Sequence, residues 1–174
     1  MAIKNNNIEF VDETVQDVLP SVEADYVEEN YNGEWYNYLR INLSELEEGD
    51  EYEGKPLLTE IEKVQFDEEE APQYRCRLLL LDDESEEYLQ INIKVKSTND
   101  VQTNIHRAST LYALLAGIND LNNPGWSSNF NHIKSVNLND WREYLDNKDL
   151  MSIKVVEKTG SNFTYNSFRV TSLS

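Results

Sequence analysis

The clearest structural signal in the chain is the stretch YLQINIKVK, residues 88–96. Its aliphatic side chains fall at every second position, and the positions between them carry polar side chains. Alternation with a period of two is typical of a β-strand that buries one face against a core and turns the other to water. The sequence therefore predicts a strand over residues 88–96, with its partners among the neighbouring segments.

Two further strands are predicted before this one. Residues 74–81 (YRCRLLLL) have strand-forming side chains, and the acidic turn DDES at 82–85 leads from them into the alternating stretch. Residues 57–66 are also strand-like and end at the charged loop DEEEAP of 67–72, where a proline stops the strand. Because turns separate these segments, the three strands are expected to form a curled antiparallel meander.

The chain after the meander predicts two helices. The cluster STND at 97–100 is a helix start, and apolar residues follow it from Val101 to Leu121 at three- and four-residue spacing. A second, shorter helix is predicted over residues 138–147, whose apolar side chains also share one face. Helices in this position form an insertion between the meander and the remaining strands.

Two strands close the chain, at 150–158 and 163–173, and the turn TGSN joins them. Three strands, a helical insertion and two further strands follow one another in the order of an OB-fold. The predicted fold class is therefore mainly β with a helical insertion (α+β): an OB-like five-stranded antiparallel barrel with its helices between strands three and four.

Acidic residues are concentrated in the first half of the chain. Residues 1–87 hold 26 acidic and 6 basic side chains, whereas residues 88–174 hold 7 acidic and 9 basic ones, within a net charge of −18. We expect residues 1–50 to form an acidic arm and residues 51–174 to form one barrel domain. A protein with this distribution can present a local cationic surface to an anionic partner in spite of its net charge.

The arm has features of its own. It contains a predicted short helix at 12–19, an aromatic cluster from Tyr26 to Tyr38 and the strand-like segment RINL at 40–43. Aromatic residues are rare in disordered tails, so one hypothesis is that the arm packs against the barrel. The other hypothesis is that it imitates single-stranded DNA, with carboxylates in place of phosphates and tyrosines in place of bases. The arm is also the candidate surface for a protein partner.

Composition predicts a soluble, cytoplasmic protein without a membrane span. The N-terminus MAIKNNN lacks the apolar region of a secretory signal, and the longest aliphatic run, residues 78–81, is too short to cross a bilayer. Cys76 is the only cysteine, which excludes an intrachain disulfide and a four-cysteine zinc site. In its apolar strand we expect Cys76 to be a buried, inert thiol.

No catalytic, cofactor or metal site is expected. The chain has no phosphate-binding glycine loop and no nucleophile elbow around a serine. His106 and His132 do not have the spacing of metal ligands, and the acidic turns at 67–70 and 82–84 lack the EF-hand pattern. A metal-dependent nuclease would need an acidic residue where Asn92 precedes Ile93 and Lys94.

Several short segments resemble a known family. They are EGKP at 53–56, the strand and turn of 78–83, the helical segment of 111–117, and Val155 with YNSFRV at 165–170. Their layout resembles phage- and mobile-element-encoded OB-fold proteins that bind single-stranded DNA. Acidic tails in such proteins usually lie at the C-terminus, whereas here the acidity lies at the front.

The resemblance implies a surface with cations that follow phosphates and flat groups on which bases stack. Outward positions of the predicted strands supply both kinds of side chain. The alternative is that these charges form only the solvated face of an amphipathic sheet. The candidate nucleic-acid-binding residues are Arg75, Arg77, Tyr88, Asn92, Lys94, Lys96, Trp126, Lys154, Lys158, Tyr165 and Arg169.

We therefore expect a non-catalytic protein that binds single-stranded DNA, or alternatively RNA, in the replication or recombination of a phage or mobile element. The alternative is an acidic adaptor or DNA mimic whose partner is a basic protein. The two hypotheses differ in the surface that binds the partner. The first uses the sheet faces of the second half of the chain, and the alternative uses the carboxylates of its first half.

Overall fold

The computed structural model of the chain describes residues 37–64, 71–96, 101–129 and 132–174. These residues are mainly β-structure, with two α-helices and two short 3-10 helices. The helix predicted at 12–19, most of the aromatic cluster and the acidic loop of 67–70 lie outside the described residues. In chain order the elements are β1 (Leu39–Asn42), η4 (Leu43–Glu45), β2 (Glu51–Leu58), β3 (Glu62–Val64), β4 (Gln73–Asp82), β5 (Glu87–Lys94), β6 (Val101–His106), α3 (Thr110–Asn122), η5 (Trp126–Asn129), β7 (His132–Asn137), α4 (Leu138–Asp146), β8 (Met151–Thr159) and β9 (Thr164–Leu173).

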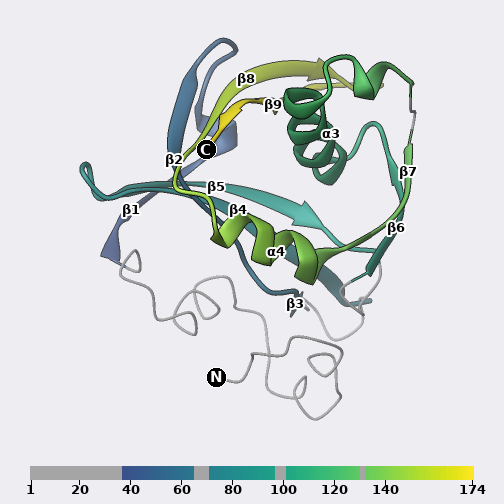
Figure 1. Ribbon diagram of the computed structural model, residues 1–174, viewed down its shortest axis with the longest axis horizontal. Coiled ribbons are helices and arrows are strands. Elements are labelled where there is room, and N and C mark those ends of the chain that lie inside the picture. The colour runs from purple at the N-terminus through teal and green to yellow at the C-terminus, as the bar shows by residue number, and fades with distance from the viewer. Residues whose placement is uncertain (1–36, 65–70, 97–100, 130–131) are drawn as a thin grey trace.

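The strands form one curled sheet, a half-barrel, and a separate two-stranded ribbon of β6 and β7 (Figure 1). The order in the curled sheet is β1-β5-β4-β2-β8-β9, with the short β3 paired to β4. Neighbouring strands are antiparallel except β1 and β5, which are parallel. Within the described residues β9 forms no ladder with β5, so the sheet stays open on that side.

The sheet curls around β2, because the two halves of this strand have different partners. Residues 51–54 pair with β8, and Lys55 to Leu58 pair with β4. Gly54 stands at the change of partner, where an added Cβ would lie 2.7 Å from the carbonyl oxygen of Leu81. That distance is shorter than van der Waals contact, so only a residue without a side chain allows the two backbones to approach in this way.

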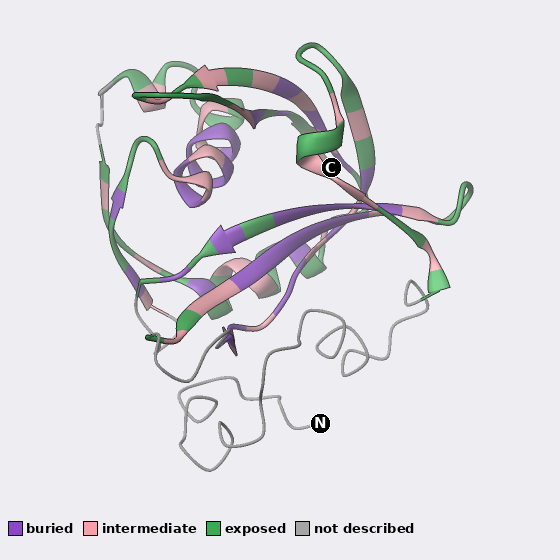
Figure 2. Ribbon diagram, turned by 180° about the vertical axis from the view of Figure 1, so that it is seen from behind, coloured by how far each residue is buried: buried purple, intermediate pink, exposed green. Residues whose placement is uncertain are grey.

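α3 fills the inside of the curled sheet. Its start is fixed by Ser109, whose Oγ accepts a hydrogen bond from the backbone N–H of Tyr112 at 3.1 Å. The apolar side of the helix is buried with the inner residues of β4, β5, β8 and β9, and Figure 2 colours the buried parts of these elements purple. Gly117 brings α3 close to β9, since a Cβ there would lie 3.1 Å from the side chain of Val170.

α4 packs against β2 and buries Leu138 and Leu145 in the same core. Its C-terminal end is closed by a side chain from β2. Nζ of Lys55 donates to the carbonyl oxygens of Asp146 at 2.8 Å and Lys148 at 2.6 Å. A cation in this position satisfies carbonyls that the last helical turn leaves without partners and complements the helix dipole.

Most of the predicted elements are confirmed. The strand at 88–96 appears as β5, its predicted hairpin partner as β4, and the two closing strands as β8 and β9. The short helix at 138–147 appears as α4, and the first three residues of RINL lie in β1, whereas Leu43 begins η4. Neither α3 nor α4 is long and apolar enough to cross a membrane, and the rest of the described chain offers no other candidate.

The helix predicted to begin at 97–100 is wrong in its first part. Residues 101–106 form β6, and the helix α3 begins only after Ser109. Val101 and Ile105 fit helical spacing, but they also lie an even number of residues apart and so fit a strand. Pairing with β7, more than 20 residues away in the chain, decides between the two.

The strand predicted at 57–66 is also divided. β2 ends at Leu58, and β3 begins at Glu62. Thr59 holds the break against β4, because its N–H donates to the carbonyl oxygen of Arg77 at 2.9 Å and its Oγ1 accepts from the Arg77 N–H at 2.8 Å. The chain therefore changes direction here without leaving β4.

Candidate nucleic-acid interface

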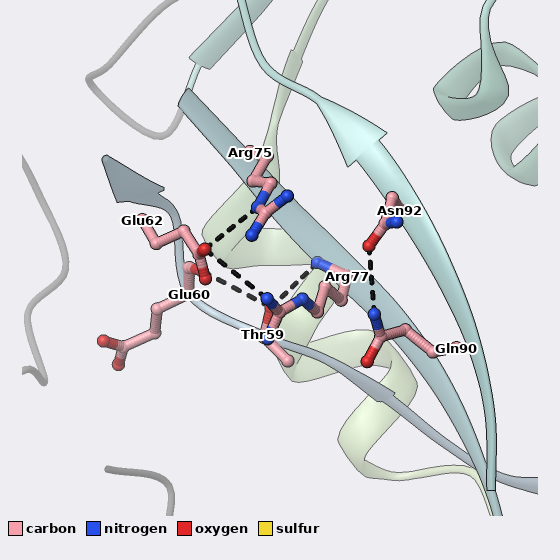
Figure 3. Close-up of polar contacts among 7 residues, drawn as sticks. All are labelled: Thr59, Glu60, Glu62, Arg75, Arg77, Gln90 and Asn92. Atoms are coloured by element: carbon pink, nitrogen blue, oxygen red, sulfur yellow. Dashed lines mark hydrogen bonds and ion pairs between the residues drawn. The ribbon is translucent and has the colours of Figure 1, made fainter. Parts of the chain in front are cut away.

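The hairpin of β4 and β5 brings four of the predicted site residues onto one face. Arg75 lies opposite Lys94, and Arg77 lies opposite Asn92. Directly opposite residues of an antiparallel pair project from the same side of the sheet. The intervening residues of both strands belong to the main core, so this face is turned away from it (Figure 3).

Glu62 of β3 neutralises both arginines of this face. Its Oε2 lies 2.9 Å from Nε of Arg75 and 3.6 Å from Nη2 of Arg77 (Figure 3). Arg77 is 1% exposed. Its guanidinium therefore contributes to the packing of β3 on β4 and does not present a charge at the surface.

The other predicted residues of this hairpin are divided between core and surface. Tyr88 is 3% exposed and belongs to a second, smaller apolar cluster, so its ring does not offer a face to a base. Asn92 is exposed, and its Oδ1 accepts a hydrogen bond from Nε2 of Gln90 at 3.2 Å. Lys94 and Lys96 are exposed at the end of β5 and remain as surface cations.

The outer face of β8 and β9 gathers the remaining cations. Lys154 lies opposite Arg169, and Lys158 lies opposite Tyr165. Four residues that alternate with them, Ile153, Val155, Phe168 and Val170, are buried in the core with α3, so the side chains of both pairs project from the other side. Arg169 is exposed, and the other three are half-buried. This register places three cations and one aromatic ring on a single sheet face.

Phe163, at the tip of this hairpin, was not among the predicted residues. It is 63% exposed, and its ring centroid lies 5.7 Å from that of Tyr165, with 44° between the ring planes. The turn is closed by the Gly160 N–H, which donates to the Phe163 carbonyl oxygen at 2.7 Å. The signal in the sequence was its position two residues before Tyr165, which puts both aromatic residues on one side of the strand.

Among the described residues, acidic side chains of β2 lie beside one end of the β8–β9 face, where Oε1 of Glu53 accepts a hydrogen bond from Oγ of Ser152 at 3.3 Å. Glu51 on β2 lies opposite Lys154, at the end away from the hairpin tip. Glu157 occupies the other face of β8, opposite Asn166. From residue 158 to the C-terminus the chain carries no acidic residue. The half of the face that bears the aromatic pair is therefore the more cationic half.

The last predicted residue, Trp126, lies in η5 and is half-buried against the main core. His106 and His132 are exposed and lie opposite each other on β6 and β7, a pairing that their sequence separation did not suggest. Cys76 is fully buried. No group of three or more His, Cys, Asp or Glu side chains that could hold a metal ion occurs in the described parts of the chain.

The turn of the β4–β5 hairpin lies at the opposite end of the molecule from the tip of β8 (Figure 1). Five of the six residues from 82 to 87 are acidic. Burial raises the pKa of Tyr52 to about 12, and the negative charges of Glu87 and Asp82 add to the shift. The described structure thus has an acidic end and, across the molecule, a cationic and aromatic hairpin.

No protein-family model, curated protein sequence or solved structure matches this chain. Its function is therefore argued from the geometry of its own side chains.

Proposed function

We propose that this chain is a non-catalytic protein that binds single-stranded nucleic acid on the outer face of β8 and β9. The observation that carries the proposal is the cross-strand arrangement of Lys154 with Arg169 and of Lys158 with Tyr165, extended by the exposed ring of Phe163. Cations that follow the backbone beside rings that accept bases are the two elements of single-strand binding.

The strand pairing supports an OB-like barrel as the scaffold. β2 pairs with both β4 and β8, β4 pairs with β5, and β8 pairs with β9, while α3 lies between β5 and β8 in the chain. We assign these five strands to the five of an OB-like barrel. On this assignment β1, β3 and the β6–β7 ribbon are additions, and the contact between β5 and β9 that would close the barrel is replaced by an opening.

The β8–β9 face suits a single strand better than a duplex. Stacking on an aromatic side chain contributes about 1–3 kcal/mol per base and requires bases that are not already paired. The tilted rings of Phe163 and Tyr165 offer this contact at the hairpin tip, and Lys158 lies opposite the second ring. We take single-stranded DNA as the first ligand and RNA as the alternative, with a role in replication or recombination of a phage or mobile element.

The acidic end supports a second candidate function, an adaptor or DNA mimic that binds a basic protein. Two carboxylates of the 82–87 turn, those of Glu87 and Asp82, add to the rise that burial causes in the pKa of Tyr52. Such a partner would contact the β4–β5 turn and leave the β8–β9 face untouched. The two functions therefore require different surfaces and can be separated by mutation.

The test is fluorescence anisotropy of a labelled oligo-dT at low and at higher salt. We expect log K to fall linearly with log salt concentration, and the variant K158E/R169E to bind at least about tenfold more weakly, with a salt slope smaller by about 1.4. R40E/K148E is the matched control, because it changes the net charge equally at positions away from the hairpin. Absence of binding at low salt, or an equal loss in both variants, would overturn the proposal.

A further inference from the structure

One continuous part of this acidic protein is almost free of carboxylates. Residues 101–139 contain β6, α3, η5 and β7 and hold a single acidic residue, Asp120, although the whole chain has 33. Both carboxylate oxygens of Asp120 are engaged by Ser127, with Oδ1 accepting from its N–H at 2.7 Å and Oδ2 from its Oγ at 2.6 Å. The one carboxylate of this segment is therefore occupied by hydrogen bonds within the protein.

The β6–β7 ribbon carries the basic side chains of this segment. His106 and His132 lie opposite each other, and Lys134 lies two residues along on the same face of β7. All three are exposed, as is Arg107 immediately after β6. Asn104 on β6 is also exposed and has a φ of 55°. The ribbon thus presents cationic and hydrogen-bonding side chains to solvent.

The ribbon also continues the cationic end of β5. The backbone N–H of Lys96 donates to Oε1 of Gln102 at 3.0 Å, which joins the end of the curled sheet to β6. Lys94 and Lys96 therefore lie next to the base of the ribbon. In Figure 1 the ribbon stands at the side of the molecule toward which β8 points, opposite the acidic β4–β5 turn. The ribbon and the β8–β9 tip thus lie on one side.

We propose that the β6–β7 ribbon is a second nucleic-acid contact, which binds the phosphate backbone of the same strand that occupies the β8–β9 face. This inference rests on the proposed function. The ribbon is assigned to the backbone because its exposed side chains are a cation, imidazoles, amides and hydroxyls, whereas its four aliphatic residues are all buried or half-buried. Charged donors without aromatic platforms position a strand and do not select its bases.

His106 is oriented for this role. Its Nδ1 accepts a hydrogen bond from the Ala108 N–H at 3.1 Å. In the neutral imidazole the proton then sits on Nε2, so this nitrogen is a donor and suits a phosphate oxygen. The same tautomer does not suit a metal ion, which would need the lone pair of Nε2. His106 is therefore assigned to anion binding.

The test compares a short and a long ligand for the full chain. An OB-fold covers about 4–16 nucleotides, so labelled oligo-dT of about six nucleotides can fill the β8–β9 face alone, and one of about thirty nucleotides reaches both contacts. We expect R107E/K134E to weaken binding of the long ligand about tenfold and to lower its salt slope by about 1.4, with little effect on the short one. K158E/R169E should weaken both, and R40E/K148E is again the control for net charge.

The outcomes separate the two proposals. If the ribbon variant binds the long ligand as tightly as the control variant does, the second contact is overturned and the β8–β9 site stands. If it weakens both ligands equally, the ribbon is part of the primary site and the two-contact arrangement is overturned. If neither ligand binds the unmodified protein, the proposed function itself has failed. Circular dichroism of each variant confirms that the fold is retained before affinities are compared.

Discussion

Arg77 on β4 and Glu62 on β3 form a buried ion pair, with 3.6 Å between Nη2 and Oε2. The side chain of Arg77 is 2% exposed and that of Glu62 is 8% exposed. Removing two charges from water is costly, and their attraction offsets the cost only while both partners are present. Glu62 also binds Arg75 at 2.9 Å, so one carboxylate holds the short β3 against two arginines of β4.

Replacing this carboxylate should destabilise the protein strongly. We expect Glu62→Gln to lower the free energy of unfolding by about 3 kcal/mol, because it removes the negative charge that faces the buried guanidinium of Arg77. Urea unfolding followed by tryptophan fluorescence measures the change. Lys63→Gln, at the next residue of β3, is the control and should stay within about 0.5 kcal/mol. An unchanged unfolding midpoint for Glu62→Gln would show that the pair does not support the fold.

The close approach of the β2 and β4 backbones at Gly54 leads to a second prediction about stability. In Gly54→Ala the new Cβ would lie 2.7 Å from the carbonyl oxygen of Leu81. Since that neighbour is backbone, β2 and β4 must separate, and we expect a loss of about 1–3 kcal/mol with a lower Tm. Gly160→Ala is the matched control, because there the nearest atoms, on Phe163, are 3.4 Å away, an ordinary contact. Equal Tm values for the two variants would contradict this account of the curl.

The parts of the fold that depend on local pattern could be predicted from the sequence. Local strand patterns and the turns between them were enough to predict β4, β5, β8 and β9, because each of these strands places apolar residues in the main core. β6 could not be predicted, since Val101 and Ile105 fit two periodicities and only the distant β7 decides between them. The parallel pairing of β1 with β5 is likewise a long-range contact that no local signal announces.

The candidate site, like the fold, could be predicted where it depends on local pattern and not where it depends on distant contacts. The register across the 159–162 turn follows from alternation, so Lys158, Tyr165 and Arg169 could be assigned to one face. The burial of Arg77 could not, because it depends on Glu62, fifteen residues earlier on a three-residue strand. A charge pattern in one strand does not show which charges a neighbouring strand will neutralise.

Tyr52 should make the protein sensitive to alkali. Burial, with the charges of Glu87 and Asp82, raises its folded-state pKa from 10.0 to about 12. The folded state holds the phenol proton of Tyr52 more tightly than the unfolded state does. The stability that this proton adds is therefore fully present below pH 10 and is lost as the pH rises to about 12. We expect Tyr52→Phe to reduce the loss of stability over this interval.

The measurement is urea unfolding at pH 8 and at several values up to pH 11. At pH 8 Tyr52→Phe should be as stable as the parent or slightly more stable, because within the described structure the Tyr52 hydroxyl is buried without a hydrogen-bond partner. Tyr144→Phe, at an exposed ring of α4, is the control for removing one phenol. Parallel pH profiles for the parent and Tyr52→Phe would disprove the assignment.

Phe163 provides the sharpest test of the β8–β9 face. Its ring is 63% exposed and packs only against Tyr165 among the described aromatic residues. An exposed ring contributes little to folding, so Phe163→Ala should leave the unfolding midpoint within about 0.5 kcal/mol of the parent. If the ring receives a base, the same change should weaken oligo-dT binding by about 1–3 kcal/mol, and because stacking carries no charge the salt slope should not change. Tyr144→Ala removes an exposed ring from α4 and should not affect binding, and an equal effect of the two variants on affinity would place the bound strand elsewhere.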